Sequence, residues 1–234
     1  MACDRRHASM DAGTPDRVVG TVIYRFDSAF RLLVAERCAA FARLPAPAIG
    51  ARRHAAVALA LVDGETQPGA RPGAAAFLLT RRAAALRAHA GQWALPGGRC
   101  DDGESAIEAA LRELAEETGL ALGAGHVLGT LDDYPTRSGY VITPVVVWAA
   151  ASGGLRPNPL EVASIHRIAL TDVAPDEAVE FFRIPESERT GVRLRLHGDH
   201  IYAPTAAMVY QFRELLAGRT TRVADFEQPV FAWQ

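Results

Sequence analysis

Residues 91–120 of the chain read GQWALPGGRCDDGESAIEAALRELAEETGL, a glycine-rich turn followed by an acidic segment. Ser105 and Glu108 have the spacing of a capping box, which places the start of a helix at Ser105. Gly119, with a leucine after it, is typical of a helix that ends in a left-handed residue and a hydrophobic contact. The sequence therefore predicts a helix over residues 105–118, shortly after the glycine turn.

Three glutamates project from one side of this helix. At about 100° per residue, Glu113, Glu116 and Glu117 share an arc of about 100°. The arc adjoins the apolar stripe that contains Ala110 and Leu114, so the carboxylates are expected at the edge of the core. Oxygen ligands clustered without His or Cys suit a hard cation, Mg²⁺ or Mn²⁺, rather than Zn²⁺.

This carboxylate arc favours chemistry on a diphosphate. Mg²⁺ keeps several waters and prefers a few carboxylates together with substrate phosphates. A solvated helix face usually mixes charges of both signs, because like charges at three- and four-residue spacing repel each other. An exposed acidic helix without a ligand nevertheless explains the same residues, and the helix alone leaves both interpretations open.

Outward from this segment, apolar runs alternate with turns. Short apolar runs predict strands over residues 54–62, 75–80, 127–131, 140–150 and 162–169. The fourth of these strands is expected to be interrupted by Pro144. Apolar residues at three- and four-residue steps predict helices over residues 27–44 and 205–217. Strands mixed with a few helices predict an α/β or α+β domain.

The same pattern divides the chain into four segments. We expect a loose tail over residues 1–20, an N-terminal helical extension over 21–52 and a central domain over 53–185. Residues 186–234 are expected to form a C-terminal segment with a helix packed on that domain. What the two terminal extensions contribute is left open by the sequence.

Composition narrows the class of protein. The chain has 234 residues, a mass of 25.1 kDa and a formal net charge of −2, which argues against a nucleic-acid-coating protein. No apolar run reaches the ~18 residues of a membrane helix, and the N-terminus lacks the apolar core of a secretory signal. Three cysteines without metal spacing indicate a reducing compartment. We therefore expect a cytoplasmic protein without nucleic-acid or membrane partners.

The helix and its preceding turn fit the pattern Gly98-x5-Glu104-x7-Arg112-Glu113-Leu114-x-Glu116-Glu117-x-Gly119-Leu120. This pattern resembles the Nudix box, GX5EX7REUXEEXGU, in which U is a bulky aliphatic residue, and every specified position is filled. The resemblance implies a Nudix-type α/β/α sandwich with a mixed β-sheet over residues 53–185, with the N-terminal helix and the C-terminal extension outside it. It also implies a hydrolase that acts on phosphoanhydride bonds.

The resemblance to the Nudix box also implies roles for individual residues. The expected metal ligands are Glu113, Glu116 and Glu117, with the backbone of Gly97. Arg112 and Glu104 would form the ion pair that braces the loop against the helix. Gly97 and Gly98 would let the backbone approach metal and phosphate, since glycine tolerates the required turns. Either Glu113 or Glu116 would be the general base.

A second motif lies just upstream. Residues 78–98 read LLTRRAAALRAHAGQWALPGG, which resembles the coenzyme A pyrophosphatase signature of Nudix proteins, LLTxRSx3Rx3Gx3FPGG. Ala83 stands where that signature has Ser, and Leu95 where it has Phe. The resemblance implies Mg²⁺- or Mn²⁺-dependent hydrolysis of coenzyme A or its derivatives to 3′,5′-ADP and 4′-phosphopantetheine.

The residues expected to contact this substrate are Arg82, Arg87, Gly98, Thr136 and Arg137. Arg82 and Arg87 suit phosphate because a guanidinium binds it bidentately, although solvated arginines are the simpler alternative. Residues 132–140 are similar to a loop of these pyrophosphatases that is expected to line the nucleotide or pantetheine pocket. Glu161 stands where related proteins often carry another acidic residue. Trp93 is expected in the core, with stacking on an adenine as the alternative.

Other functions remain open at this point. The nearest competitor is a Nudix pyrophosphatase for ADP-ribose, a dinucleotide polyphosphate or an oxidised nucleotide. A Nudix module that binds a nucleotide without catalysis is a second alternative, but the complete set of box residues argues against it. Nudix proteins often dimerise, so a homodimer is a further expectation.

Overall fold

The computed structural model of the chain describes residues 16–18, 21–45, 53–64, 73–86, 89–150, 152, 154–185 and 187–229. Most of the expected tail at residues 1–20 lies outside this part, as do residues 46–52 of the expected extension and Arg87. The short strands β1 (Asp16–Val18) and β2 (Thr21–Ile23) pair with each other. Among the described residues, no helix combines the length and apolar character needed to cross a membrane.

A mixed eight-stranded sheet forms the centre of the molecule. Its strands are β3 (Arg53–Asp63), β4 (Ala75–Arg82), β5 (Trp93–Ala94), β6 (Gly97–Arg99), β7 (Val127–Thr130), β8 (Tyr134–Pro135), β9 (Tyr140–Trp148) and β10 (Val162–Ala169). The order is β10–β4–β3–β9–β7, with β5 beside β4, β6 beside β3 and β8 beside β9. The central pair β3–β9 is parallel, and the other pairs are antiparallel.

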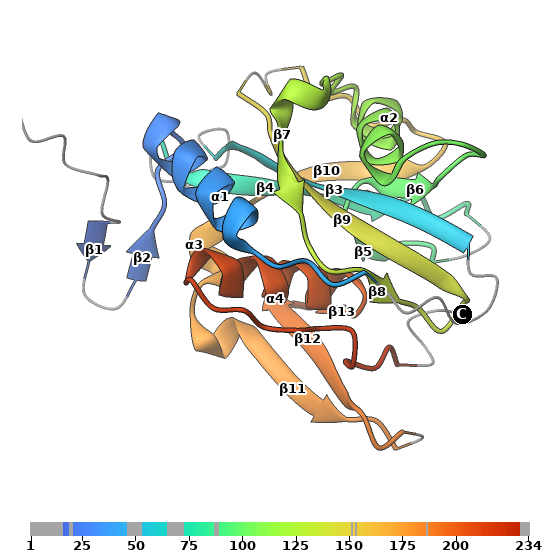
Figure 1. The fold of residues 1–234 in the computed structure, drawn as a ribbon. Helices are drawn as coiled ribbons and strands as arrows, with labels where there is room; N and C mark the ends of the chain where they lie inside the picture. The colour runs from blue at the N-terminus through green and yellow to red at the C-terminus, as the bar shows by residue number, and fades with distance from the viewer. Residues whose placement is uncertain are drawn as a thin grey trace, which may run out of the picture.

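Both faces of this sheet are covered. Ala58 and Ala60 of β3 lie in the core cluster under α2 (Ala106–Thr118), whereas Leu59 and Leu61 lie in the opposite cluster, with α1 (Ser28–Ala40) and α4 (Thr205–Leu216). Strands that are buried on both faces read as continuous apolar runs. Figure 1 shows α2 on one face and α1 and α4 on the other. The expected α/β/α sandwich with a mixed sheet is confirmed.

Two expected boundaries differ from the structure. The N-terminal helix begins as predicted, with Asp27 as its N-cap, but ends at Ala40 rather than at residue 44. The backbone after it is extended, and Leu44 N donates a hydrogen bond of 2.6 Å to Asp132 Oδ1. Strand β9 runs through Pro144 without interruption. The carbonyl of Pro144 accepts from Leu131 N, so its missing N–H faces the gap between β8 and β7 and removes no ladder bond.

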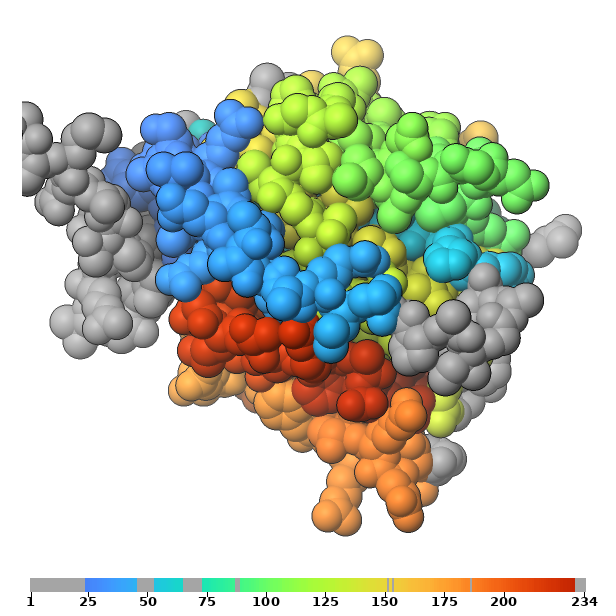
Figure 2. All heavy atoms as spheres, in the orientation of Figure 1, coloured from blue at the N-terminus to red at the C-terminus, as the bar shows by residue number. Residues whose placement is uncertain are grey.

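A second sheet, which was not predicted from the sequence, follows the central sheet and spans the expected boundary at residue 185. Strands β11 (Val179–Arg183), β12 (Thr190–Leu196) and β13 (Asp199–Tyr202) form it, preceded by α3 (Leu170–Val173). Helix α4 lies between this sheet and the central one (Figure 1), where its apolar residues join those of β12 and β13 in one core. Figure 2 shows α4 packed directly against the N-terminal helix.

Candidate functional site

Helix α2 has the termini that its sequence predicts. Ser105 Oγ accepts from Glu108 N, and Glu108 Oε2 accepts from Ser105 N at 2.9 Å, so the capping box is complete. Gly119 ends the helix in the left-handed conformation, with φ of 74°. Ala110 and Leu114 are fully buried against the sheet. Their burial fixes the rotation of the helix and turns its glutamates toward the neighbouring loops.

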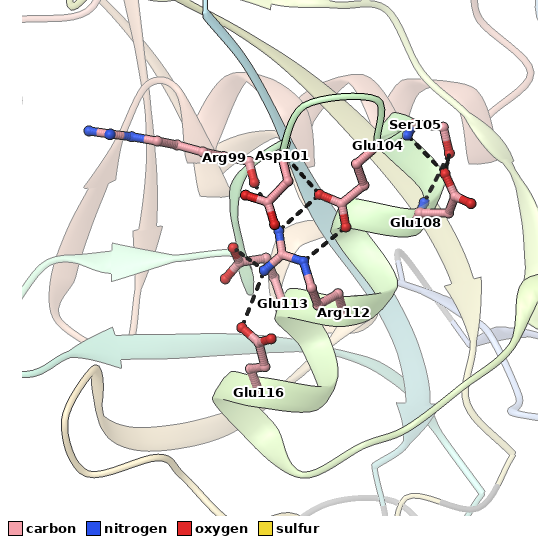
Figure 3. Close-up of polar contacts among 8 residues, drawn as sticks. All are labelled: Arg99, Asp101, Glu104, Ser105, Glu108, Arg112, Glu113 and Glu116. Carbon is pink, nitrogen blue, oxygen red and sulfur yellow. Dashed lines mark hydrogen bonds and ion pairs between the residues drawn. The ribbon is translucent and has the colours of Figure 1, made fainter.

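Arg112 braces the turn against α2. Its Nε and Nη2 donate to the two carboxylate oxygens of Glu104 at 2.9 and 3.0 Å, and Nη2 also donates to the carbonyl of Arg99. Nη1 donates to Glu113 and Glu116 at 2.9 and 3.2 Å (Figure 3). All five N–H groups of the guanidinium are therefore engaged. The hydrogen bonds from Arg112 lower the pKa of Glu104, and the expected ion pair between the two is present.

The glycine turn allows a close approach between β6 and α2. A Cβ at Gly98 would overlap the carboxylate of Glu113, and one at Gly97 would overlap the backbone of Ala56 and Val57. Any larger residue at either position would push the sheet, the turn or the glutamate away. Both glycines are thus required by space, and the approach of their backbone to metal and phosphate stays a prediction.

Glu117 is the most unusual carboxylate of the site. Only 3% of the residue is exposed, and its Oε2 has no hydrogen-bond partner among the described residues. Burial raises the pKa of Glu117 to about 8, while the charge of Arg82 and a hydrogen bond from the backbone of Gly97 act in the opposite direction. Burial also raises the pKa of Glu113. A buried carboxylate oxygen without a partner costs free energy unless a ligand satisfies it.

Three carboxylates meet at this place. Oxygen atoms of Glu113, Glu117 and Glu161 lie within 4.8 Å of one another. We call these three residues the carboxylate group. Glu161 comes from the loop before β10, and its carbonyl accepts from Ala83 N at 2.8 Å, which ties that loop to the end of β4. The donor set contains only carboxylate oxygens and is suited to a hard divalent cation.

Glu116 lies outside the carboxylate group. Its side chain is 55% exposed and accepts one hydrogen bond from Arg112. The structure therefore brings together two of the three glutamates that the sequence singled out, and adds Glu161 in the place of the third. A metal-binding role for Glu116 stays a prediction.

A pocket of about 260 Å³ reaches the carboxylate group through Gly98, which lines the pocket and lies against the carboxylate of Glu113. Its lining includes four residues of the predicted set, Arg82, Gly97, Gly98 and Thr136, together with Trp93 and Tyr140. The Nε atom of Arg82 is buried and lacks a hydrogen-bond partner within the described part of the chain. The pocket thus has a cation and a glycine turn at the side where the carboxylates lie.

The other predicted contacts are placed differently. Arg137 does not line the pocket, because its Nε donates to Glu227 Oε1 at 2.6 Å. Trp93 lines the pocket while its Nε1 donates to Asp199 Oδ2 at 2.8 Å, so one edge of the indole is held by the C-terminal segment. Arg87 is not among the described residues.

One part of the pocket wall was not predicted from the sequence. It is built by Pro204, Thr205, Met208 and Gln228, all from the C-terminal segment. These residues carry no motif, and they reach the pocket only because α4 packs on the sheet. No local sequence signal could have identified them.

The chain is similar to known proteins over the same residues that form the central sheet and α2. The model of the NUDIX domain matches residues 52–185, more than half of the chain. A curated protein of Photorhabdus laumondii, named uncharacterized Nudix hydrolase NudL, is 33% identical over 165 residues, which cover 69% of this chain and 84% of the relative. Its namesake from Pectobacterium atrosepticum is 38% identical over 151 residues, covering 61% and 76%.

Among solved structures, a Nudix hydrolase from M. smegmatis, RenU, is 32% identical and covers 53% of this chain and 74% of its own, with a TM-score of 0.39. The family assignment rests on the domain match and on the NudL relatives, which agree with the complete box on α2. The chain belongs to the Nudix family and is a Nudix hydrolase.

Proposed function

We propose that the chain is a divalent-metal-dependent diphosphatase that hydrolyses coenzyme A or its derivatives to 3′,5′-ADP and 4′-phosphopantetheine. The observation that carries this proposal is the carboxylate group, which adjoins a pocket lined by Arg82 and the glycine turn. A metal-binding group beside a pocket that carries a cationic side chain is what the hydrolysis of a diphosphate requires. Cytoplasmic location and a homodimer stay predictions.

The residues of this site fit a divalent ion such as Mg²⁺ or Mn²⁺. The unpartnered Oε2 of Glu117, the all-oxygen donor set and the close turn at Gly98 each support the fit. Glu113, Glu117 and Glu161 would hold the ion. When bound, such an ion neutralises diphosphate oxygens and makes a water more acidic.

The remaining groups of the site have separate tasks. Arg82 binds and orients the phosphate nearest to Glu117, whose carboxylate its charge already influences. Arg112 holds the carboxylate of Glu113 in place and keeps the turn against the helix. Glu116 is exposed and lies outside the carboxylate group, so of the two candidates for the general base it is better placed to accept a proton from water at its carboxylate.

Coenzyme A is favoured over other diphosphates by the motif over residues 78–98. This motif departs from the coenzyme A pyrophosphatase signature at Ala83 and Leu95, and both changes are mild where these residues lie. Ala83 is buried and does not line the pocket, so the missing hydroxyl removes no pocket contact, and Leu95 forms part of the apolar wall. Pro204 and Met208 of the C-terminal segment add further apolar side chains to the pocket lining.

The test is product analysis with a panel of substrates. The purified protein is incubated with Mg²⁺ and coenzyme A, ADP-ribose, a dinucleotide polyphosphate or an oxidised nucleotide, and the products are identified by mass spectrometry. We expect coenzyme A to be cleaved fastest, and to yield 3′,5′-ADP. Glu117→Gln should abolish this cleavage, whereas the exposed Glu177→Gln should not. Rapid cleavage of ADP-ribose with intact coenzyme A would overturn the proposed substrate.

A further inference from the structure

The register of three neighbouring strands gathers cationic and aromatic side chains on one face of the sheet. Tyr140 of β9 pairs with Arg53 of β3, and Arg99 of β6 pairs with Ala55, two residues further along β3. Residues two apart in a strand share a face. Ala55, Arg99 and Tyr140 line the pocket, so Arg53 lies on the pocket face as well.

The two guanidinium groups lie against the same aromatic ring. Cζ of Arg53 is 4.1 Å and Cζ of Arg99 is 5.3 Å from the ring centroid of Tyr140, both within the range of cation–π contacts. Arg53 Nη2 also donates to the carbonyl of Ser138 at 3.2 Å. Within the described ranges, neither arginine forms an ion pair with a carboxylate. Two like charges are therefore held near one ring without an anion between them.

Polar groups of the neighbouring loop complete this arrangement. The hydroxyl of Tyr140 is buried and has no hydrogen-bond partner in the part of the chain that the structure describes. Thr136 Oγ1 and Ser138 Oγ lie 3.0 Å apart, and both residues line the pocket. A buried hydroxyl without a partner is costly, so it points to a ligand or water that satisfies it. Guanidinium groups together with hydroxyls match the oxygens of a phosphate.

Arg53 and Arg99 are different residues from the arginine that acts on the carboxylate group. Arg82 is the arginine whose charge acts on Glu117. The side chain of Arg99 extends away from the brace formed by Arg112 and its glutamates (Figure 3). The pocket therefore offers a second position for an anion, apart from the one where the diphosphate would lie.

We propose that Arg53, Arg99 and Tyr140 bind a phosphomonoester of the substrate that is separate from the diphosphate under attack. The inference rests on the proposed function, under which this group is the 3′-phosphate of coenzyme A. It makes the three residues specificity determinants: they distinguish a substrate with a third phosphate from an otherwise identical one that lacks it.

The kinetic test compares coenzyme A with dephospho-coenzyme A, which lacks only the 3′-phosphate. The wild-type protein should have a higher kcat/KM for coenzyme A. Arg53→Gln and Arg99→Gln should each lower that value about tenfold and leave the value for dephospho-coenzyme A nearly unchanged, as loss of one charged hydrogen bond would do. Arg99→Lys, which keeps the charge, should retain part of the preference. A merely structural role would lower both values together.

Arg31→Gln is the matched control, because Arg31 is an exposed arginine of α1, a helix that contributes no residue to the pocket. It should leave the preference for coenzyme A unchanged. An undiminished preference in both Arg53→Gln and Arg99→Gln, or an equal loss on both substrates, would overturn the assignment.

A binding measurement separates this inference from the proposed function. Isothermal titration calorimetry of the metal-free protein compares 3′,5′-ADP with AMP, which differ by the same phosphate. The wild type should bind 3′,5′-ADP about tenfold more tightly, and Arg99→Gln should lose this difference. If coenzyme A is not hydrolysed but this result holds, the proposed function fails and the phosphate site stands. Equal affinities, or no detectable preference, would overturn the phosphate site even in an enzyme that cleaves coenzyme A.

Discussion

Glu117→Gln should remove a large pH dependence from the stability of the metal-free protein. Burial raises the pKa of Glu117 from 4.5 to about 8, so the folded chain binds this proton more tightly than the unfolded chain does. The resulting stabilisation is complete below pH ~4.5 and is lost as the pH rises through ~8. At ~1.4 kcal/mol per pKa unit, the shift corresponds to at most about 5 kcal/mol. Relaxation of the site and entry of water reduce this to an expected change of about 2–3 kcal/mol.

The assay is urea unfolding in the presence of a chelator between pH 5 and 9. The free energy of unfolding of the wild type should fall over this range, and that of Glu117→Gln should fall by about 2–3 kcal/mol less. Glu113, whose pKa burial also raises, adds a smaller dependence of the same sign that persists in the variant. The exposed Glu177→Gln should behave like the wild type. A variant with the same pH dependence as the wild type would refute the reasoning.

Three further predictions concern the site. Glu161→Gln should weaken Mn²⁺ binding, measured by electron paramagnetic resonance, by at least about tenfold; unchanged affinity would remove Glu161 from the ligand set. Gly98→Ala should lower kcat strongly, because the added Cβ overlaps the Glu113 carboxylate. Circular dichroism should still show a folded protein, and full activity would contradict this close approach. Arg112→Lys should lower kcat about 10- to 100-fold, because a lysine cannot bridge both oxygens of Glu104 and also reach the helix glutamates. A wild-type rate in this variant would show that the contacts of Arg112 are dispensable.

Local signals predicted the central elements of the fold. The capping box and the terminal glycine of α2 act within a few residues, so the helix has the predicted bounds within one residue. Strands β3 and β10 are found where apolar runs predicted them. The predicted interruption of the strand at Pro144 was wrong. A missing N–H breaks a ladder hydrogen bond only where it faces a paired strand, and the sequence does not show which neighbour it faces.

The candidate site was predictable only where one helix and one turn supply it. Glu113 and Glu117 share a helix face, which periodicity shows directly. Glu161 joins them from a loop more than forty residues away, through a contact with the end of β4 that no spacing along the chain encodes. The same holds for Met208 and Gln228, whose place in the pocket wall depends on the packing of α4. Strands β11–β13 were missed because their short segments alternate with turns and charged residues.

The central claim is that Glu113, Glu117 and Glu161 together hold a divalent cation beside the glycine turn. Anomalous diffraction from crystals soaked in MnCl₂ at pH 8.5, above the raised pKa of Glu117, tests it most directly. We predict an anomalous peak between the three carboxylates, within about 2.0–2.4 Å of at least one oxygen of each. A manganese ion bound elsewhere, with these three side chains making no contact to it, would contradict the account.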